Sequence, residues 1–200
     1  MSYIDTTVAI IVAYLLGSLS SAVIVCKLMG LPDPRTQGSG NPGTTNVLRM
    51  GGKKAAVITL VGDVLKGVIP VLLAKWVGIL PVGLALVTLA AFLGHLYPLF
   101  FHFKGGKGVA TAAGCITALA WPVGVALIVT WLIVALCFRY SSLSALVAAV
   151  LAPFYTWYFT NPEYTMAVVL ISVLLLYRHR SNIRKLLAGK ESKIGQKYRV

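Results

Sequence analysis

Apolar residues dominate seven stretches of this chain, and polar residues gather in the segments between them. The apolar stretches cover residues 4–27, 55–76, 79–101, 109–121, 122–138, 143–160 and 164–177. A hydrocarbon core of about 30 Å is crossed by about 20 helical residues, so each of the first three stretches predicts a transmembrane helix. The fourth and fifth are short. Joined, they would form a helix of about 45 Å, too long for one span and interrupted by Pro122.

Positive charge is unevenly distributed between these stretches, and this predicts the topology. The chain has 18 Lys and Arg residues but only five Asp and Glu, for a formal net charge of +13. With seven spans and the N-terminus outside, every basic residue except Lys66 and Lys75 falls on the cytosolic side, as the positive-inside rule requires. Joining the fourth and fifth stretches would move Arg139 and the basic tail outside. We therefore predict an all-α integral membrane protein, a single domain over 1–200, with about seven transmembrane helices, some short, an outside N-terminus and a cytosolic C-terminus.

Composition supports a membrane protein and argues against several other classes. Of the 200 residues, 58% are hydrophobic and 12% are charged, whereas soluble domains carry about 25% charged residues. The three cysteines, Cys26, Cys115 and Cys137, form no Cys-x-x-Cys pair and no Cys/His cluster, so neither a zinc site nor a disulfide framework is indicated. No basic segment precedes the first apolar stretch, which is too long for a cleaved signal peptide, and we expect it to be retained as a span.

A loop rich in glycine, hydroxyl and amide side chains follows the first apolar stretch. Its residues and the nearby cations are Gly38, Ser39, Gly40, Asn41, Pro42, Gly43, Thr44, Thr45, Asn46, Arg49, Lys53 and Lys54. Glycines let successive backbone N–H groups face one concavity, and cations add charge, a combination suited to phosphate. The glycine spacing resembles a dinucleotide-binding fingerprint, but this loop follows a predicted transmembrane helix and not a strand. Thr44 occupies the position at which a Walker motif requires Lys. The alternative, a flexible connector, would need fewer hydrogen-bonding side chains.

A second glycine loop, Lys104-Gly105-Gly106-Lys107-Gly108, directly precedes the fourth apolar stretch. Backbone N–H groups at a helix N-terminus bind anions, and two lysines add positive charge. A positive-inside stop signal is the alternative, although it would need the lysines and not three glycines. Two such loops on one predicted face indicate an enzyme that acts on phosphorylated substrates at a membrane surface.

Charged residues and histidines within or near the spans each have two interpretations. Asp63 and Lys66 lie three residues apart on one helix face, and they form either a structural ion pair or a source of positive potential for the site. His95, within the third span, is predicted to be a core histidine that is hydrogen-bonded to a neighbouring helix. His179 follows the last span, in reach of the other loops. The basic tail around it also predicts attraction to anionic membrane lipids.

Both glycine loops lack carboxylates, which limits the chemistry. Glu191 is the only acid of the predicted cytosolic tail, so paired-carboxylate or Ser-His-Asp catalysis is poorly supported. Cation clamps and oxyanion-directed N–H groups suit acyl or phosphoryl transfer. A small transporter or anion channel is an alternative that would need polar residues along several spans. A phosphatidyltransferase is another, and it would usually need a cluster of metal-binding aspartates.

Three motifs, in this order, resemble those of the bacterial PlsY-type glycerol-3-phosphate acyltransferases. They are Gly38-Ser39-Gly40-Asn41 through Thr45-Asn46 and Arg49, then Phe103-Lys104-Gly105-Gly106-Lys107-Gly108, then His179-x-x-Asn182-Ile183-x-x-Leu186-x-x-Gly189-x-Glu191. The resemblance covers essentially the whole chain. It implies transfer of a fatty acyl group from acyl phosphate to the 1-hydroxyl of glycerol 3-phosphate. The products would be 1-acyl-glycerol 3-phosphate (lysophosphatidate) and phosphate, in the first step of phospholipid synthesis.

The resemblance also implies site residues and partners. The catalytic residues it implies are Ser39, Asn41, Arg49, Lys104, His179 and Asn182. The residues it implies for binding substrate or phosphate are Gly38, Gly40, Gly43, Thr45, Asn46, Lys53, Gly105, Gly106, Lys107, Gly108 and Ser142. We expect no metal, no organic cofactor and no nucleic-acid partner. We also expect a monomer among the lipids of the bacterial cytoplasmic membrane, with its active site on the cytosolic face.

Overall fold

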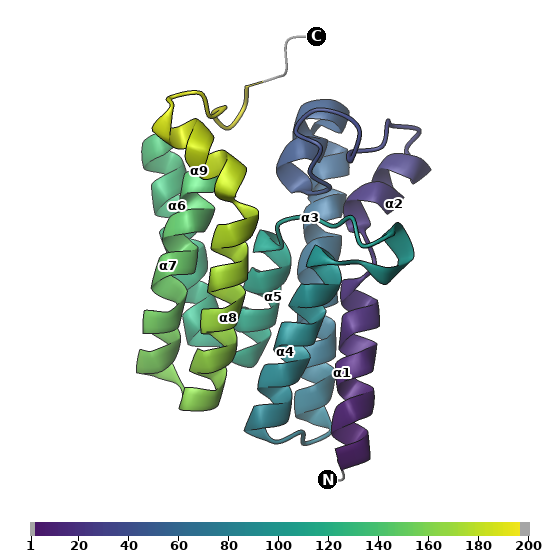
Figure 1. Cartoon of the computed structure of the whole chain (residues 1–200), viewed down its shortest axis with the longest axis vertical. Helices are drawn as coiled ribbons and strands as arrows, with labels where there is room; N and C mark the ends of the chain where they lie inside the picture. The colour runs from purple at the N-terminus through teal and green to yellow at the C-terminus, as the bar shows by residue number, and fades with distance from the viewer. Residues whose placement is uncertain (1–2, 197–200) are drawn as a thin grey trace.

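The computed structural model describes residues 3–196, and all regular structure in that range is helical (Figure 1). The elements are α1 (Tyr3–Gly17), α2 (Ser21–Leu28), α3 (Thr44–Trp76), α4 (Pro81–Leu96), the 3₁₀ turn η1 (Leu99–Phe101), α5 (Val109–Leu119), α6 (Trp121–Phe138), α7 (Ser141–Phe159), α8 (Pro162–Arg178) and α9 (Arg180–Leu187). Lys197 and Arg199, which the charge argument assigns to the cytosolic tail, lie outside the described residues.

Helix length supports a multi-pass membrane protein. Four helices are long and apolar enough to cross a bilayer, and the number rises to six if each of two bent pairs counts as one span. These pairs are α1 with α2, bent by 42°, and α8 with α9, bent by 57°. The predicted first span, 4–27, is therefore broken, because the chain leaves the helix between Gly17 and Ser21. Trp76 and Trp157, near the ends of α3 and α7, are exposed, as expected for aromatic residues at a membrane interface.

The fourth apolar stretch forms α5, a helix of only 11 residues. Its last carbonyl groups would be costly to leave unpaired inside a bilayer. Lys75 of α3 satisfies them, because its Nζ donates to the carbonyl oxygens of Ala118 (2.9 Å) and Leu119 (2.8 Å). The separation predicted at Pro122 is confirmed: α5 ends at Leu119 and α6 begins at Trp121. A partial span next to a full one is thus stabilised by a single lysine.

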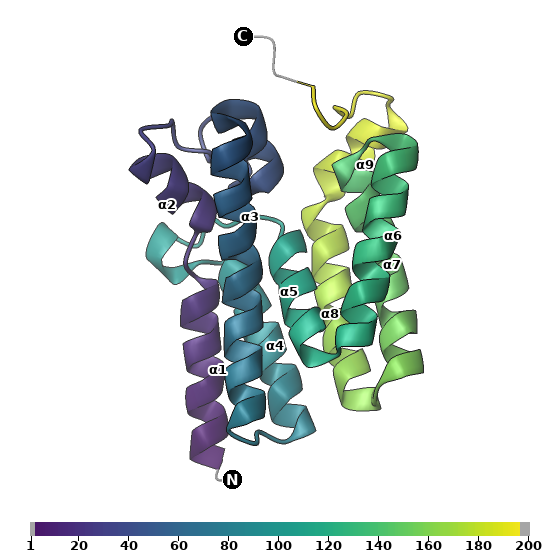
Figure 2. The ribbon, with the colours of Figure 1, turned by 180° about the vertical axis from the view of Figure 1, so that it is seen from behind.

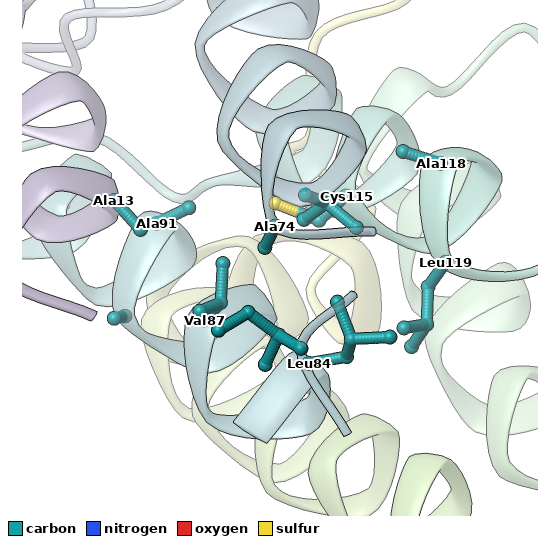
Figure 3. Close-up of a cluster of buried hydrophobic side chains, with 11 residues drawn as sticks. Ala13, Ala74, Leu84, Val87, Ala91, Cys115, Ala118 and Leu119 are labelled. Atoms are coloured by element: carbon teal, nitrogen blue, oxygen red, sulfur yellow. The ribbon is translucent and has the colours of Figure 1, made fainter. Parts of the chain in front are cut away.

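Small residues allow the helices to approach one another closely. A Cβ added to Gly94 of α4 would lie 2.3 Å from the carbonyl oxygen of Tyr14 in α1, and one added to Gly114 of α5 would lie 2.4 Å from that of Val64 in α3. Figure 3 shows the buried alanines between these helices, including Ala13. Close backbone contact of this kind is the usual basis of helix association in membranes.

The segments that carry the predicted site residues lie toward one end of the bundle. α1, α3 and α4 lie on one side of α5, whereas α6, α7 and α8 lie on the other, and α4 also contacts α8 (Figures 1 and 2). The polar loop before α3, the loop before α5 and α9 lie toward the end that carries the C-terminus, and the N-terminus lies at the opposite end (Figures 1 and 2). Both glycine loops and the basic tail are therefore brought to one end of the bundle.

Candidate functional site

The first glycine loop is held in shape by Asn46, whose side chain is almost completely buried. Its Nδ2 donates to the carbonyl oxygens of Pro34 (2.9 Å) and Gln37 (3.0 Å), and its Oδ1 accepts from the backbone N–H of Ser39 (2.9 Å). The sequence implied a phosphate ligand here, but all three of these contacts lie within the loop. Asn46 therefore fixes the loop, and the N–H of Ser39 is occupied.

The predicted polar loop 28–54 is shorter in the structure, because α3 begins at Thr44. Thr45 and Arg49 consequently lie on the first turns of a helix, and Lys53 lies just beyond its interruption. The helix is interrupted at Gly52, where φ is 77°. Thr45 Oγ1 lies 3.3 Å from the Oγ of Ser141 in α7, which joins the two halves of the bundle at this end.

The second glycine loop binds a cation through its carbonyl groups. Arg178, the last residue of α8, donates from NH2 to the carbonyl oxygens of Gly105 (2.7 Å) and Gly106 (2.8 Å), and from Nε to that of Gly106 (3.1 Å). The N–H of Gly106 donates to the carbonyl oxygen of His95 (3.3 Å). The sequence predicted an oxyanion cradle of N–H groups. The N–H of Gly106 is bonded within the protein, and the carbonyl groups of Gly105 and Gly106 hold an arginine.

A polar cavity of about 270 Å³ lies where these segments meet. The residues that line it come from the first loop, the second loop and the α8–α9 junction, and they are Asn41, Lys107, Arg178, Arg180, Ser181 and Arg184. Four of the six are cations. Asn41 and Lys107 were implied by the sequence, whereas the arginines and Ser181 were not. A signal existed, because the run from Arg178 to Asn182 follows directly on the last apolar stretch.

Lys107 belongs to a hydrogen-bonded chain of side chains at the cavity. Its Nζ donates to Asn182 Oδ1, and Asn182 Nδ2 donates to Glu191 Oε1 (2.8 Å). Ser142 Oγ donates to the same carboxylate oxygen (2.8 Å). Burial lowers the pKa of Lys107 to about 8, while the negative charge of Glu191 opposes this shift. The network joins the second glycine loop, α7, α9 and the tail, and Glu191, not chosen as a site residue from the sequence, accepts two of its hydrogen bonds.

His179 occupies the bend between α8 and α9 and is buried. Its Nδ1 lies 2.8 Å from the carbonyl oxygen of Leu175, which can only accept, so the neutral ring carries its proton on Nδ1. Burial is the main cause that lowers the pKa of His179 to about 4, and the nearby charge of Lys107 contributes. At neutral pH the ring is uncharged, and its Nε2 is a hydrogen-bond acceptor.

Other residues implied by the resemblance lie further from the cavity. Lys104 and Lys53 are exposed and do not line it. One guanidinium nitrogen of Arg49 lies 3.4 Å from the carbonyl oxygen of Ser192 in the tail. The structure thus brings together Asn41, Lys107, Ser142, His179 and Asn182.

Several glycines implied as phosphate ligands adopt left-handed backbone conformations or precede helices. Gly38 (φ 61°) and Gly40 (φ 69°) adopt left-handed backbone conformations in the first loop. Gly43 precedes α3, and Gly108 (φ 85°) precedes α5. Among residues 3–196, no three His, Cys, Asp or Glu side chains are placed to hold a metal ion.

Comparisons with known proteins give one consistent result. Residues 7–189 match the family described as glycerol-3-phosphate acyltransferase. A glycerol-3-phosphate acyltransferase of Thioalkalivibrio sulfidiphilus is 60% identical over 186 residues, covering 92% of each chain. The corresponding protein of Methylococcus capsulatus is 58% identical over 186 residues, covering 92% of this chain and 94% of the relative.

Two crystal structures are also similar. One is PlsY (YgiH), an integral membrane glycerol 3-phosphate acyltransferase, in its glycerol 3-phosphate form, with a TM-score of 0.90 and 42% identity over 96% of both chains. The other is the lysophosphatidic acid form, with a TM-score of 0.87 and 41% identity, again over 96% of both chains.

Proposed function

This chain belongs to the glycerol-3-phosphate acyltransferase family, and we propose that its acyl donor is acyl phosphate and its acceptor the 1-hydroxyl of glycerol 3-phosphate. The products are then 1-acyl-glycerol 3-phosphate and inorganic phosphate. The proposal extends to a monomer in the bacterial cytoplasmic membrane, with the site on the cytosolic face and no cofactor.

The observation that carries the proposal is the cation-lined cavity at one end of an apolar bundle. Lys107, Arg178, Arg180 and Arg184 surround a polar space, and Asn41 and Ser181 add hydrogen-bonding groups. Arginine matches the geometry of phosphate oxygens, and a phosphate-bearing substrate offsets the repulsion between these cations. An acyl chain attached to one phosphate can remain in the bilayer beside the helices. The site thus suits one lipid-soluble and one water-soluble substrate that both carry phosphate.

The reaction follows from groups already in place. The 1-hydroxyl oxygen attacks the carbonyl carbon of the acyl phosphate, an ester bond forms, and the bond from that carbon to the phosphate oxygen breaks. The departing phosphate takes the electron pair, and the cations at the cavity stabilise its charge. Because the donor is already activated, no covalent nucleophile on the protein is required.

Proton transfer is assigned to the substrates with help from His179. The proton of the 1-hydroxyl passes to a phosphate oxygen, while the Nε2 of neutral His179 accepts a hydrogen bond from the other hydroxyl of glycerol 3-phosphate and so orients the acceptor. The low pKa of this ring makes it a weak base, so a positioning role fits better than an indispensable proton acceptor. Ser142 and Asn182 donate hydrogen bonds to Glu191. These bonds hold the carboxylate away from the reacting phosphate.

Purified protein supplied with a synthetic acyl phosphate and glycerol 3-phosphate tests this function. Release of inorganic phosphate that depends on both substrates, with matching formation of 1-acyl-glycerol 3-phosphate, is expected. Acyl-CoA in place of acyl phosphate is expected to give no product. Robust turnover with acyl-CoA alone would overturn the donor assignment while leaving the family assignment intact.

A further inference from the structure

A buried polar cluster lies inside the bundle, away from the cavity. Asp63 of α3 lies 2.9 Å from Lys66 Nζ and 3.6 Å from His95 Nδ1 of α4, and all three side chains are at most 6% exposed. Lys66 also donates to the carbonyl oxygen of Leu19, at the break between α1 and α2 (2.8 Å). His95 Nδ1 lies 3.1 Å from Thr111 Oγ1 of α5. Asp63 and Lys66 are thus in contact, and the predicted interhelical hydrogen bond of His95 is confirmed.

The other edge of the His95 ring faces the second glycine loop. A Cβ added to Gly106 would lie 2.4 Å from His95 Nε2, and one added to Gly105 would lie 2.1 Å from the carbonyl oxygen of His95. The N–H of Gly106 donates to that same carbonyl. Both glycines are thus packed against one residue of α4, whose ring Nδ1 is hydrogen-bonded to Thr111 Oγ1 and lies 3.6 Å from Asp63 Oδ1.

The same two glycines hold Arg178, which lines the cavity. The guanidinium donates three hydrogen bonds to the carbonyl oxygens of Gly105 and Gly106, and it lies 5.7 Å from the ring centre of Tyr97, the residue after α4. No other acceptor for this guanidinium is found among residues 3–196. A continuous set of contacts therefore runs from Asp63 through His95 and Gly106 to Arg178.

We propose that His95 is a positioning residue: its ring and carbonyl fix the Gly105–Gly106 loop, and the loop directs Arg178 into the phosphate-binding cavity. Thr111, which is hydrogen-bonded to Nδ1, and the nearby charge of Asp63 orient the ring, and neither residue lines the cavity. Ionisable groups buried within spans are costly, and they are retained mainly where function needs them. The inference rests on the proposed function only in that the anion held by Arg178 is the phosphate of a substrate.

The experiment combines His95 variants with Arg178→Ala. His95→Gln places an amide near the position of Nε2 and can still contact Gly106, whereas His95→Asn reaches only toward Thr111. Binding of glycerol 3-phosphate by calorimetry, with KM and kcat where turnover exists, is measured for each variant. Thr88→Val is the matched control, because Thr88 is fully buried on the same helix and its hydroxyl has no hydrogen-bond partner.

We expect His95→Ala and His95→Asn to raise the dissociation constant for glycerol 3-phosphate about tenfold, and His95→Gln to recover most of this loss. In the Arg178→Ala background, His95→Ala should add less than about twofold, because residues that act as one unit are not additive. Thr88→Val should bind as the unchanged protein does.

Two results would overturn the proposal. One is an equal loss for His95→Ala with and without Arg178; the other is equal binding by His95→Asn and His95→Gln. If His95→Ala does not fold, the Gln and Asn variants decide the matter in the same way. Absence of acyl transfer in the unchanged protein would count against the proposed reaction, while the binding measurement would still report on His95.

Discussion

The two lysines of the second glycine loop are separated by two residues, yet they occupy different environments. Lys107 lines the cavity, is partly buried and donates a hydrogen bond to Asn182, whereas Lys104 is exposed and does not line the cavity. We therefore expect Lys107→Ala to cripple the enzyme and Lys104→Ala to have little effect. Lys104→Ala is the matched control, because it removes the same type of side chain and the same charge from the same loop.

The magnitude follows from the position of Lys107. Two unit charges about 4 Å apart interact by about 4 kcal/mol at an effective dielectric constant of about 20, and loss of one oxyanion contact commonly lowers the rate by about 10²–10³. Lys107→Ala should therefore reduce kcat/KM by about 10²-fold or more. For exposed Lys104, a charge contribution of about 1 kcal/mol or less corresponds to less than about fivefold.

Phosphate release from acyl phosphate and glycerol 3-phosphate measures both variants, and thermal unfolding checks that both fold. Lys107→Arg, which keeps the charge, should retain more activity than Lys107→Ala. Near-normal kinetics for a folded Lys107→Ala protein, or a larger loss for Lys104→Ala, would show that the cavity described here is not where the phosphate binds.

Four further outcomes are expected. Because the pKa of Lys107 is about 8, its positive charge is present below that pH and lost above it. Affinity for glycerol 3-phosphate should therefore fall as the pH rises through about 8, and Lys107→Arg should abolish this fall. His179→Ala should lower kcat strongly and His179→Gln should recover part of it; a Gln variant no better than Ala would assign the ring an essential proton transfer. EDTA should leave the rate unchanged, and a loss restored by magnesium would contradict the cofactor-free proposal. Single cysteines at Ser39, Lys104 and Lys190 in a cysteine-free background should be labelled from the cytosolic side only, and labelling of one of them from the opposite side would refute the shared site.

The helices of this protein were largely predictable from the sequence, because apolar stretches of the right length have few alternatives in a membrane. The boundaries were less predictable. The break before Ser21 is stabilised by Lys66, which donates to the carbonyl of Leu19, and the early end of α5 is stabilised by Lys75. These two lysines are the exceptions to the predicted cytosolic placement of positive charge. Their use as hydrogen-bond donors to helix ends depends on contacts between distant segments, which no local pattern reveals.

The candidate site was predicted at the level of segments and only partly at the level of residues. The glycine loops and the basic tail do meet, but glycine was interpreted as a source of N–H donors. In the structure, Gly105 and Gly106 are needed for close approach to His95, and their carbonyls bind Arg178. Asn46 likewise uses its amide to shape its own loop. The chemical type of a side chain indicates what it can bind, whereas the partner it has depends on packing between α4, α5 and α8.

The cations of the cavity explain how the site can bind the phosphate group of a substrate selectively. Lys107, Arg178, Arg180 and Arg184 are held together, and neighbouring cations help to lower the pKa of Lys107. Glu191 is the carboxylate that the network contacts, and it accepts from Ser142 and Asn182. Repulsion between the cations destabilises the free site, and a phosphate that enters relieves it. Under the proposed reaction, both substrates and both products carry this group. Because the cations bind the phosphate of a substrate in this proposal, we expect inorganic phosphate to compete with that substrate for the same side chains.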